Sequence, residues 1–278
     1  MNAQVLIVLG FRILSPLLPG LAARLARRLL MTPRVHPMQD WEKAPAGAEI
    51  LRFGEGLVAR RWGRGPHVLL LHGWSGRYTQ FGPLIEALVR AGFAPIAIDP
   101  PAHGNSPGRE SHPIAFADAL FDAAEAFAPV YAVIGHSMGA GAAGFTLANG
   151  LEVERAVLIG GPASMSRVLE RFSAAIGLSR TARAMLFERV GRHMGVAEHD
   201  LDVERLAEPE GVRVLLVHDE DDRDVPVAEA HAIKSAWPRS ELHLTRGLGH
   251  RRLLSDEATI RRIVGFVAAP ARSTAFVR

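Results

Sequence analysis

The fold is decided by the stretch VYAVIGHSMGAGAAGFTLA, residues 130–148. Val130 to Gly135 form a short apolar run typical of a buried strand, and the small residues after Met138 allow a helix to pack closely on a sheet. Between them lies Gly135-His136-Ser137-Met138-Gly139, which matches G-x-S-x-G. At a sharp strand-to-helix turn this pattern exposes a serine hydroxyl beside the N–H groups of the helix N-terminus. Ser137 is therefore the candidate nucleophile.

Outward from this stretch, short apolar runs alternate with longer amphipathic segments, which predicts an α/β fold with a mostly parallel sheet. The first two strands are expected to form an antiparallel hairpin at one edge. The predicted strands are Glu49–Phe53, Leu57–Trp62, Val68–His72, Ala94–Asp99, Val130–Gly135, Ala156–Gly160, Val212–His218 and Glu241–Thr245. The predicted helices cover Phe81–Ala91, Ile114–Phe127, Met138–Ala148, Ala228–Trp237 and Asp256–Val267.

Residues 162–210 interrupt the alternation. They contain no convincing strand, but apolar residues recur at helical spacing, among them Met165, Leu169 and Phe172. Ligands of open α/β sheets bind beyond the carboxyl ends of the strands, so a helical insertion at such an end is placed to cover the site. The alternative is a helical layer that only covers the sheet.

A serine nucleophile needs a base and an acid that orients the base, in the chain order Ser, Asp, His for this architecture. His250 follows the last predicted strand in the glycine-containing loop Arg246–His250, and we expect it to be the base. Seven other histidines are expected to be surface or core residues: His36, His67, His112, His193, His199, His231 and His243.

The acid is expected in the loop after the strand Val212–His218, where five carboxylates occur within six positions: Asp219, Glu220, Asp221, Asp222 and Asp224. Asp222 is the preferred candidate and Asp219 the alternative. Asp224 is expected to cap the helix that follows. A calcium loop is disfavoured because the spacing is not that of an EF-hand.

Acyl transfer also requires N–H donors for the developing oxyanion. The backbone N–H of Met138 and that of Trp74, in the loop His72–Gly76, are the expected pair. His72 is expected to support this loop. The residues predicted to line a substrate pocket are Trp74, His136, Met165, Leu169 and Phe172.

Five motifs in this order resemble those of the α/β-hydrolase superfamily over residues 48–270: HGW at 72–74, DPPAHGNS at 99–106, GHSMG at 135–139, HDEDDRDVP at 218–226 and GLGH at 247–250. The resemblance implies an eight-stranded sheet with an antiparallel second strand, a helical cap after the sixth strand and a Ser-His-Asp mechanism. It also implies a structural turn formed by Asp99, His103, Gly104 and Ser106.

The expected function is a serine hydrolase that cleaves carboxylic esters of short to medium acyl chains, because the cap is apolar and contains methionine. Thioesterase, other acyl or C–C bond hydrolase, membrane-associated lipid hydrolase and non-catalytic binding protein are the alternatives, since the fold does not choose among them. No cofactor and no metal are implied. The expected partner is a small ester or acyl substrate, and no nucleic acid.

The charge distribution sets the N-terminus apart. The formal net charge is +3, and five arginines before Asp40, the first acidic residue, contribute +5, which leaves −2 for the rest of the chain. These arginines are Arg12, Arg24, Arg27, Arg28 and Arg34. The absence of cysteine excludes disulfides, cysteine-ligated zinc and a thiol nucleophile.

Arg12 divides the apolar start of the chain into uncharged runs too short to span a bilayer. A cleaved signal peptide is disfavoured because no basic residue precedes the apolar run and because Pro16 and Pro19 are expected to break the helix early. Leucines at helical spacing with arginines on another face predict an amphipathic basic helix over residues 21–31. Packing on its own domain, self-association and contact with anionic lipid remain open for this helix.

Three regions are thus expected: an N-terminal helix and linker at 1–47, a hydrolase core at 48–161 and 211–278, and a helical cap at 162–210. We expect a cytoplasmic location, and peripheral membrane contact is an alternative.

Overall fold

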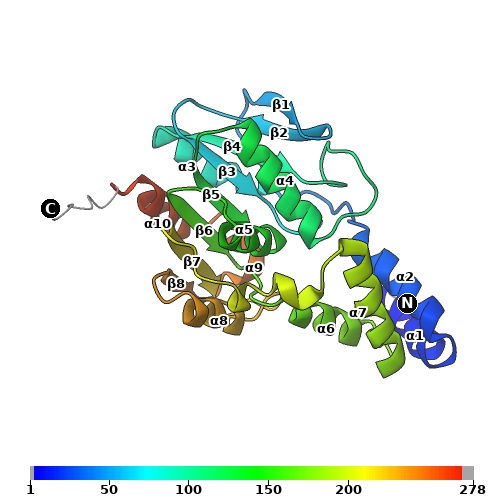
Figure 1. Cartoon of the computed structure of the whole chain (residues 1–278). Coiled ribbons are helices and arrows are strands. Elements are labelled where there is room, and N and C mark those ends of the chain that lie inside the picture. Colours follow the sequence, from blue (N-terminus) through cyan, green and yellow to red (C-terminus); the bar gives the residue numbers. More distant parts are fainter. Residues whose placement is uncertain (1–2, 271–278) are drawn as a thin grey trace.

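The computed structural model describes residues 3–270. Its centre is an eight-stranded sheet in the order β1-β2-β4-β3-β5-β6-β7-β8 (Figure 1). The strands are β1 (Glu49–Phe53), β2 (Leu57–Arg61), β3 (His67–Leu71), β4 (Ala94–Asp99), β5 (Val130–His136), β6 (Arg155–Ile159), β7 (Arg213–Asp219) and β8 (Glu241–Thr245). β2 is antiparallel to β1 and β4, and the other neighbours are parallel. The predicted fold class is confirmed. Residues 271–278, which were expected in the core, lie outside the described residues.

Alternating side chains of the central strands supply two hydrophobic cores, one on each face of the sheet. In β3, Leu69 and Leu71 belong to one core, and Val68 and Leu70 to the other. The first core is covered by α4 (Pro113–Ala126), α5 (Met138–Ala148) and α8 (Ala228–Ala236), and the second by α3 (Gly82–Arg90) and α10 (Glu257–Ala268). This arrangement holds the carboxyl ends of the strands at fixed positions.

A third hydrophobic cluster lies outside the sheet. It joins α6 (Met165–Ala175) and α7 (Arg180–Met194), which lie between β6 and β7 in the chain, to α1 (Ala3–Leu17) and α2 (Pro19–Met31) from the N-terminus. Buried alanines of α2, Ala22, Ala23 and Ala26, allow this helix to pack closely against α7. The N-terminal helices and the inserted helices therefore form one packed body beside the sheet (Figure 1).

The N-terminal prolines do not break the first helix early, contrary to the prediction from the sequence. Pro16 lies in the last turn of α1, and Pro19 is the first residue of α2. A proline costs little at the first position of a helix because its missing N–H would have no intrahelical partner there. The chain therefore forms a helical hairpin in which α1 ends only at Leu17. None of the helices in the described part of the chain has both the length and the apolar character needed to cross a bilayer.

The segment 32–47, predicted as a linker, is tied to the body of the molecule. The Arg34 N–H donates to Ser75 Oγ at 2.9 Å, and the indole N–H of Trp62 donates to the Pro45 carbonyl at 2.9 Å. The Arg77 guanidinium donates to the carbonyl of His36. We call residues 32–47 the N-terminal strap.

Candidate active site

Ser137 lies at the turn between β5 and α5 with φ 54° and ψ −119°, a region that a residue with a side chain seldom adopts. Its N–H donates to the Ile159 carbonyl at 2.9 Å, which fixes the turn to β6. A Cβ on Gly135 would lie 2.3 Å from the Gly139 oxygen, and one on Gly139 would lie 2.1 Å from the Leu71 oxygen. The two glycines are therefore required because helix and sheet approach too closely for any side chain.

His250 and Asp222 form a hydrogen-bonded pair. The Nδ1 of His250 is 2.7 Å from the Oδ2 of Asp222, and the Oδ1 of Asp222 accepts from the N–H groups of Asp224 and Val225, each at 2.9 Å. Burial raises the pKa of Asp222, but the His250 hydrogen bond and charge and the Val225 N–H outweigh it, so that this pKa is lowered. Gly160, with φ +55°, packs beside the pair. The carboxylate is thus held ionised against the imidazole.

Asp219, the alternative acid, has a different set of partners. One oxygen accepts from the Thr245 hydroxyl at 2.7 Å and the Leu248 N–H at 3.0 Å, and the other from the Gly249 N–H at 2.9 Å and the Asp221 N–H at 3.0 Å. Asp219 therefore holds the segment after β8 that leads into the short helix α9 (Gly249–Arg252), which contains His250. The structure brings Asp222, and not Asp219, to the imidazole.

Asp224 does not cap the following helix, so that prediction is wrong. α8 begins at Ala228 with Val227 as its N-cap residue and without a side-chain cap. The Asp224 N–H instead turns back to Asp222, because the acidic loop folds around that carboxylate.

The two predicted oxyanion donors lie beside Ser137. A Cβ on Gly73 would be 2.8 Å from the Cβ of Ser137, so the backbone entering Trp74 passes directly next to the serine. Among the hydrogen bonds of residues 3–270, neither the Trp74 N–H nor the Met138 N–H, at the start of α5, has a partner. Both donors remain available for an oxygen atom bound at Ser137.

Two buried histidines support the site. His136 Nε2 donates to the His250 carbonyl at 2.9 Å, and His72 Nδ1 donates to the Gly73 carbonyl at 2.8 Å. Burial is the main cause that lowers the pKa of each to about 3. Both rings are therefore neutral at physiological pH. His136 fixes the backbone of the candidate base, and His72 fixes the loop that carries Trp74.

The motif Asp99 to Ser106 forms a structural turn, as the resemblance implied. Asp99 is paired with Arg60 at 2.7 Å and accepts from the Asn105 N–H at 3.0 Å. The Ser106 hydroxyl accepts from the Val58 N–H at 2.8 Å, and His103 Nε2 accepts from the Ser75 N–H at 3.0 Å. These bonds connect β2, β4 and the Trp74 loop.

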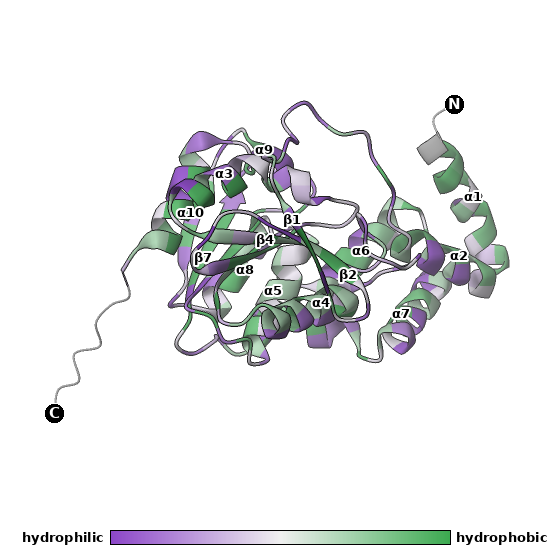
Figure 2. Cartoon of the chain, turned by 90° about the horizontal axis from the view of Figure 1, so that it is seen from above, coloured by the Kyte–Doolittle hydropathy of each residue, from purple (hydrophilic) through white to green (hydrophobic). Residues whose placement is uncertain are grey.

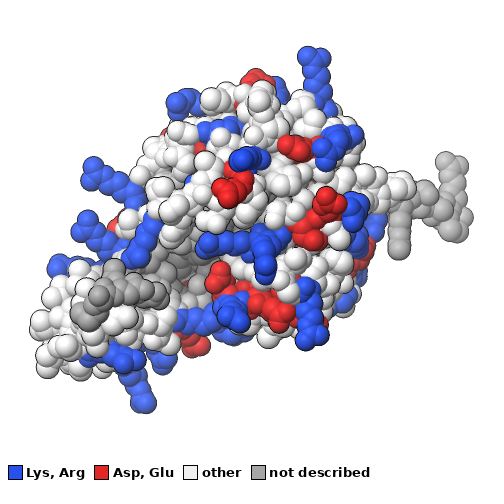
Figure 3. Space-filling model, turned by 180° about the vertical axis from the view of Figure 1, so that it is seen from behind, with Lys and Arg blue, Asp and Glu red and all other residues white. Residues whose placement is uncertain are grey.

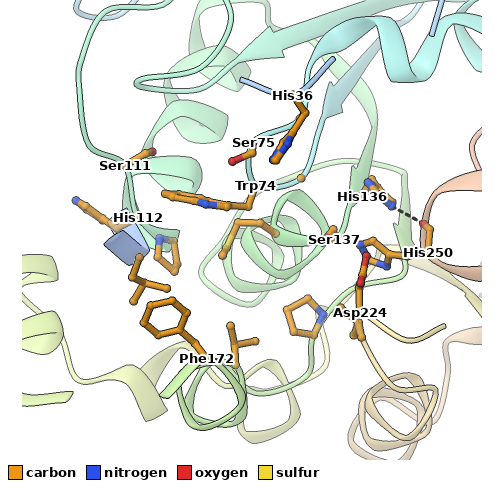
Figure 4. Close-up of a pocket in the computed structure, with 18 of the residues that line it drawn as sticks. His36, Trp74, Ser75, Ser111, His112, His136, Ser137, Phe172, Asp224 and His250 are labelled. Carbon is orange, nitrogen blue, oxygen red and sulfur yellow. Dashed lines mark hydrogen bonds between the residues drawn. The ribbon is translucent and has the colours of Figure 1, made fainter. Parts of the chain in front are cut away.

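A cavity of about 490 Å³ opens at Ser137 (Figure 4). In Figure 4, Ser137 and His250 lie next to each other at one wall, and the rings of Trp74 and Phe172 lie across the cavity from them. The five residues predicted to line a pocket, Trp74, His136, Met165, Leu169 and Phe172, all border this cavity. The wall formed by α6 and α7 is mainly apolar: it also includes Val168, Val190 and Met194, and Arg171 is its charged residue.

Several residues that line the cavity lie outside the segments in which pocket residues were predicted. Leu30 and Met31 come from α2, and His36, Gln39 and Glu42 from the N-terminal strap. His112, which also caps α4 by accepting from the Ala115 N–H at 3.2 Å, borders the cavity as well. His36 and His112 were expected to be ordinary surface or core residues. No local motif marks these positions. The residues from α2 border the cavity because α2 packs on α7, and the strap residues do so because the strap is bonded to Ser75 and Arg77.

The sheet order, the serine at the β5–α5 turn and the Asp-His pair beyond β7 and β8 define a protein with the α/β-hydrolase fold. The chain matches the model of the alpha/beta hydrolase family over residues 68–262, which is more than half of its length, and it belongs to that family.

Solved structures with the same fold include enzymes of several kinds. An esterase from Pyrococcus furiosus is 21% identical with a TM-score of 0.59, and the match covers 85% of this chain and 95% of that one. A monoacylglycerol lipase from Paleococcus ferrophilus is 20% identical with a TM-score of 0.60 and coverage of 76% and 98%. The thioesterase domain from the curacin biosynthetic pathway is 16% identical with a TM-score of 0.59 and coverage of 80% and 99%. The comparison with curated proteins found no match.

Proposed function

We propose that the protein is a serine hydrolase that cleaves carboxylic esters through Ser137, His250 and Asp222. One observation carries the proposal. The strained serine, the Asp222–His250 pair at 2.7 Å and two unpartnered N–H groups converge on one wall of a cavity. Nucleophile, base, orienting acid and oxyanion donors are the parts that acyl transfer needs.

In the proposed reaction, Ser137 Oγ attacks the ester carbonyl while His250 Nε2 takes its proton. The Asp222 carboxylate holds Nδ1–H and stabilises the imidazolium. The Met138 and Trp74 N–H groups bind the oxyanion, and His250 then protonates the leaving alcohol. Water, activated by the same imidazole, hydrolyses the acyl-enzyme and restores Ser137.

The apolar wall below α6 and α7 is the proposed acyl site. Met165, Leu169 and Phe172 border it, and flexible methionine side chains adapt to acyl groups of different shape. A cavity of about 490 Å³ is within the usual range of small-ligand sites. These features support a short to medium acyl chain.

A panel of p-nitrophenyl esters and matched acyl thioesters, varied in chain length, tests the proposal. Wild-type protein is expected to hydrolyse the esters, and Ser137→Ala to lose about 10⁴-fold or more in kcat/KM. Ser235→Ala, an exposed serine of α8, is the matched control and is expected to retain activity.

Two results would overturn parts of the proposal. If folded wild-type protein has no activity on any ester or thioester, the proposal that it is a hydrolase is rejected. A consistent preference for thioesters over esters of equal chain length keeps the serine mechanism but replaces the substrate class.

A further inference from the structure

Among the described residues, exposed large apolar side chains are concentrated on the N-terminal hairpin. Of eleven large hydrophobic residues that are exposed in the described part of the chain, nine lie between residues 5 and 38. Seven of them belong to α1, α2 and their connection: Val5, Leu6, Leu9, Ile13, Leu17, Leu18 and Leu25. Figure 2 shows α1 as a mainly hydrophobic helix at one end of the molecule.

α1 is apolar on both its inner and its outer side. Phe11 is buried and Leu14 is half-buried against α7 and α2, whereas Ile13 is 66% exposed. The inner side is anchored at Ser15, which accepts from the Ser179 N–H at 3.0 Å and whose carbonyl accepts from the Ser179 hydroxyl at 2.9 Å. A helix that is hydrophobic all round normally has a second apolar neighbour. The outer side of α1 lacks one among the described residues.

The charged side chains of the hairpin itself are all basic. No acidic residue precedes Asp40, whereas Arg12, Arg24 and Arg28 are exposed on the hairpin. In Figure 3 the hairpin forms a largely uncharged knob with basic side chains around it.

A basic hollow lies beside α2. Arg24, Arg27, Arg28 and Arg109 line it, together with the exposed Leu25. Arg27 is paired with Glu110 at 2.8 Å, but Arg24, Arg28 and Arg109 have no ion-pair partner within residues 3–270. Three guanidinium groups without an ion pair, beside an apolar residue, fit phosphate groups at the boundary between headgroups and acyl chains.

We propose that the α1–α2 hairpin docks on the surface of an anionic phospholipid bilayer. The outer side of α1 lies among the acyl chains, and the basic hollow binds lipid phosphates. The hairpin does not span the bilayer; it lies in the interface plane, where apolar burial and attraction to anionic lipid both contribute. Because Leu30 and Met31 of α2 also border the cavity, docking places the cavity close to the lipid phase. The proposal does not depend on the reaction at Ser137.

Co-sedimentation of the full chain with vesicles tests the docking. Vesicles of phosphatidylcholine mixed with phosphatidylglycerol are expected to bind the protein more tightly than vesicles of phosphatidylcholine alone, and added salt is expected to weaken binding. Ile13→Glu should lower partitioning about tenfold or more, because it removes apolar burial and adds a repelled charge. Ile50→Glu is the matched control, since Ile50 in β1 is also 66% exposed, and it should bind like wild type.

The basic hollow is tested separately. Arg24→Gln and Arg28→Gln should each weaken binding to the anionic vesicles about fivefold. Arg64→Gln, at an exposed arginine in the loop between β2 and β3, should leave it unchanged. Circular dichroism confirms that each variant is folded.

The proposal is overturned if folded wild-type protein pellets equally with both kinds of vesicle or with neither. It is also overturned if the wild type is a dimer that Ile13→Glu converts to a monomer without any vesicle binding, because a second copy of the chain would then cover the apolar side.

Discussion

Asp222 and Asp219 are three residues apart but have different contacts. Asp222 accepts one hydrogen bond from His250 and two from its own loop, whereas Asp219 binds the segment that carries His250. Both have a lowered pKa although burial alone would raise it, so both are ionised at neutral pH. One therefore acts on the imidazole and the other on the backbone that presents it.

Asp222→Asn is expected to lower kcat on the best ester about 10³- to 10⁴-fold, because an amide cannot stabilise the imidazolium and favours the wrong tautomer. Asp219→Asn is expected to lower kcat far less and to lower Tm, because it weakens the hydrogen bonds to the His250 segment. Steady-state kinetics and thermal unfolding of both variants measure the difference. A larger loss of kcat in Asp219→Asn would reverse the assignment.

Gly73 tests the oxyanion donor at Trp74. An alanine Cβ there would lie 2.8 Å from the Cβ of Ser137, so the loop must shift and carry the Trp74 N–H with it. Gly73→Ala is expected to lose about 10²- to 10³-fold in kcat, the usual effect of removing one oxyanion donor. Gly265→Ala in α10 is the control: a Cβ there meets no atom within 4 Å, and kcat should not change. If Gly73→Ala is as active as wild type, the Trp74 N–H is not an oxyanion donor.

Among the secondary-structure elements, α6 is held to the sheet region by a carboxylate of α8. Glu229 is 2% exposed and accepts from the Ala163 N–H at 2.9 Å, from the Ser164 N–H at 3.2 Å and from Arg167 and Arg171. Burial raises the pKa of Glu229, but the two arginines and the Ala163 N–H lower it to about 2. α6 therefore begins at a fixed position above the cavity.

Glu229→Gln is expected to lower the free energy of unfolding by about 2 kcal/mol, because charge-assisted hydrogen bonds are lost from a buried position. Urea denaturation measures the change, and Glu188→Gln in α7, which removes only an exposed ion pair with Arg192, is the control with an effect near zero. A Glu229→Gln protein as stable as wild type would contradict the role of this carboxylate.

The central strands could be predicted because they are compact apolar runs. The turn at Ser137 could be predicted because its flanking glycines are required locally. The N-terminal hairpin could be predicted only in part: the leucine spacing after Gly20 indicated α2, but the prolines hid α1. Pro16 is tolerated because α1 ends one residue later. α1 is stabilised by packing on α2 and α7 rather than by local propensity. Such tertiary stabilisation leaves no local signal.

At the scale of the whole molecule, the cavity exists only because distant segments meet. Ser137 and His250 come from predicted motifs, whereas Leu30, His36 and Glu42 reach the cavity through the N-terminal hairpin and strap. The catalytic candidates could therefore be predicted from the sequence, but a complete list of lining residues could not. The position of the strap depends on long-range contacts, such as the hydrogen bond from the Arg34 N–H to Ser75 Oγ and the packing of Trp41 on the second core.

Buried neutral histidines also affect the stability of the whole molecule. His72 and His136 have folded-state pKa values of about 3, against an ordinary value of 6.5. Below about pH 6.5 the unfolded chain binds protons at these histidines that the folded chain does not. The contribution of the two neutral rings to the free energy of unfolding is therefore complete above this pH and is lost as the pH falls towards 3. Over this range the free energy of unfolding falls by about 1.4 kcal/mol per pH unit for each histidine. Urea denaturation at about pH 7.5 and about pH 5 measures it, and an unchanged free energy of unfolding would show that the rings are not held neutral.

The central claim, that Ser137 is an activated nucleophile, is tested most directly by reaction with a fluorophosphonate, followed by intact-mass and peptide mass spectrometry. We expect one adduct per chain, located on Ser137, absent from Ser137→Ala and retained in Ser235→Ala. A folded wild-type protein that gains no adduct, or gains it at another residue, would contradict the account.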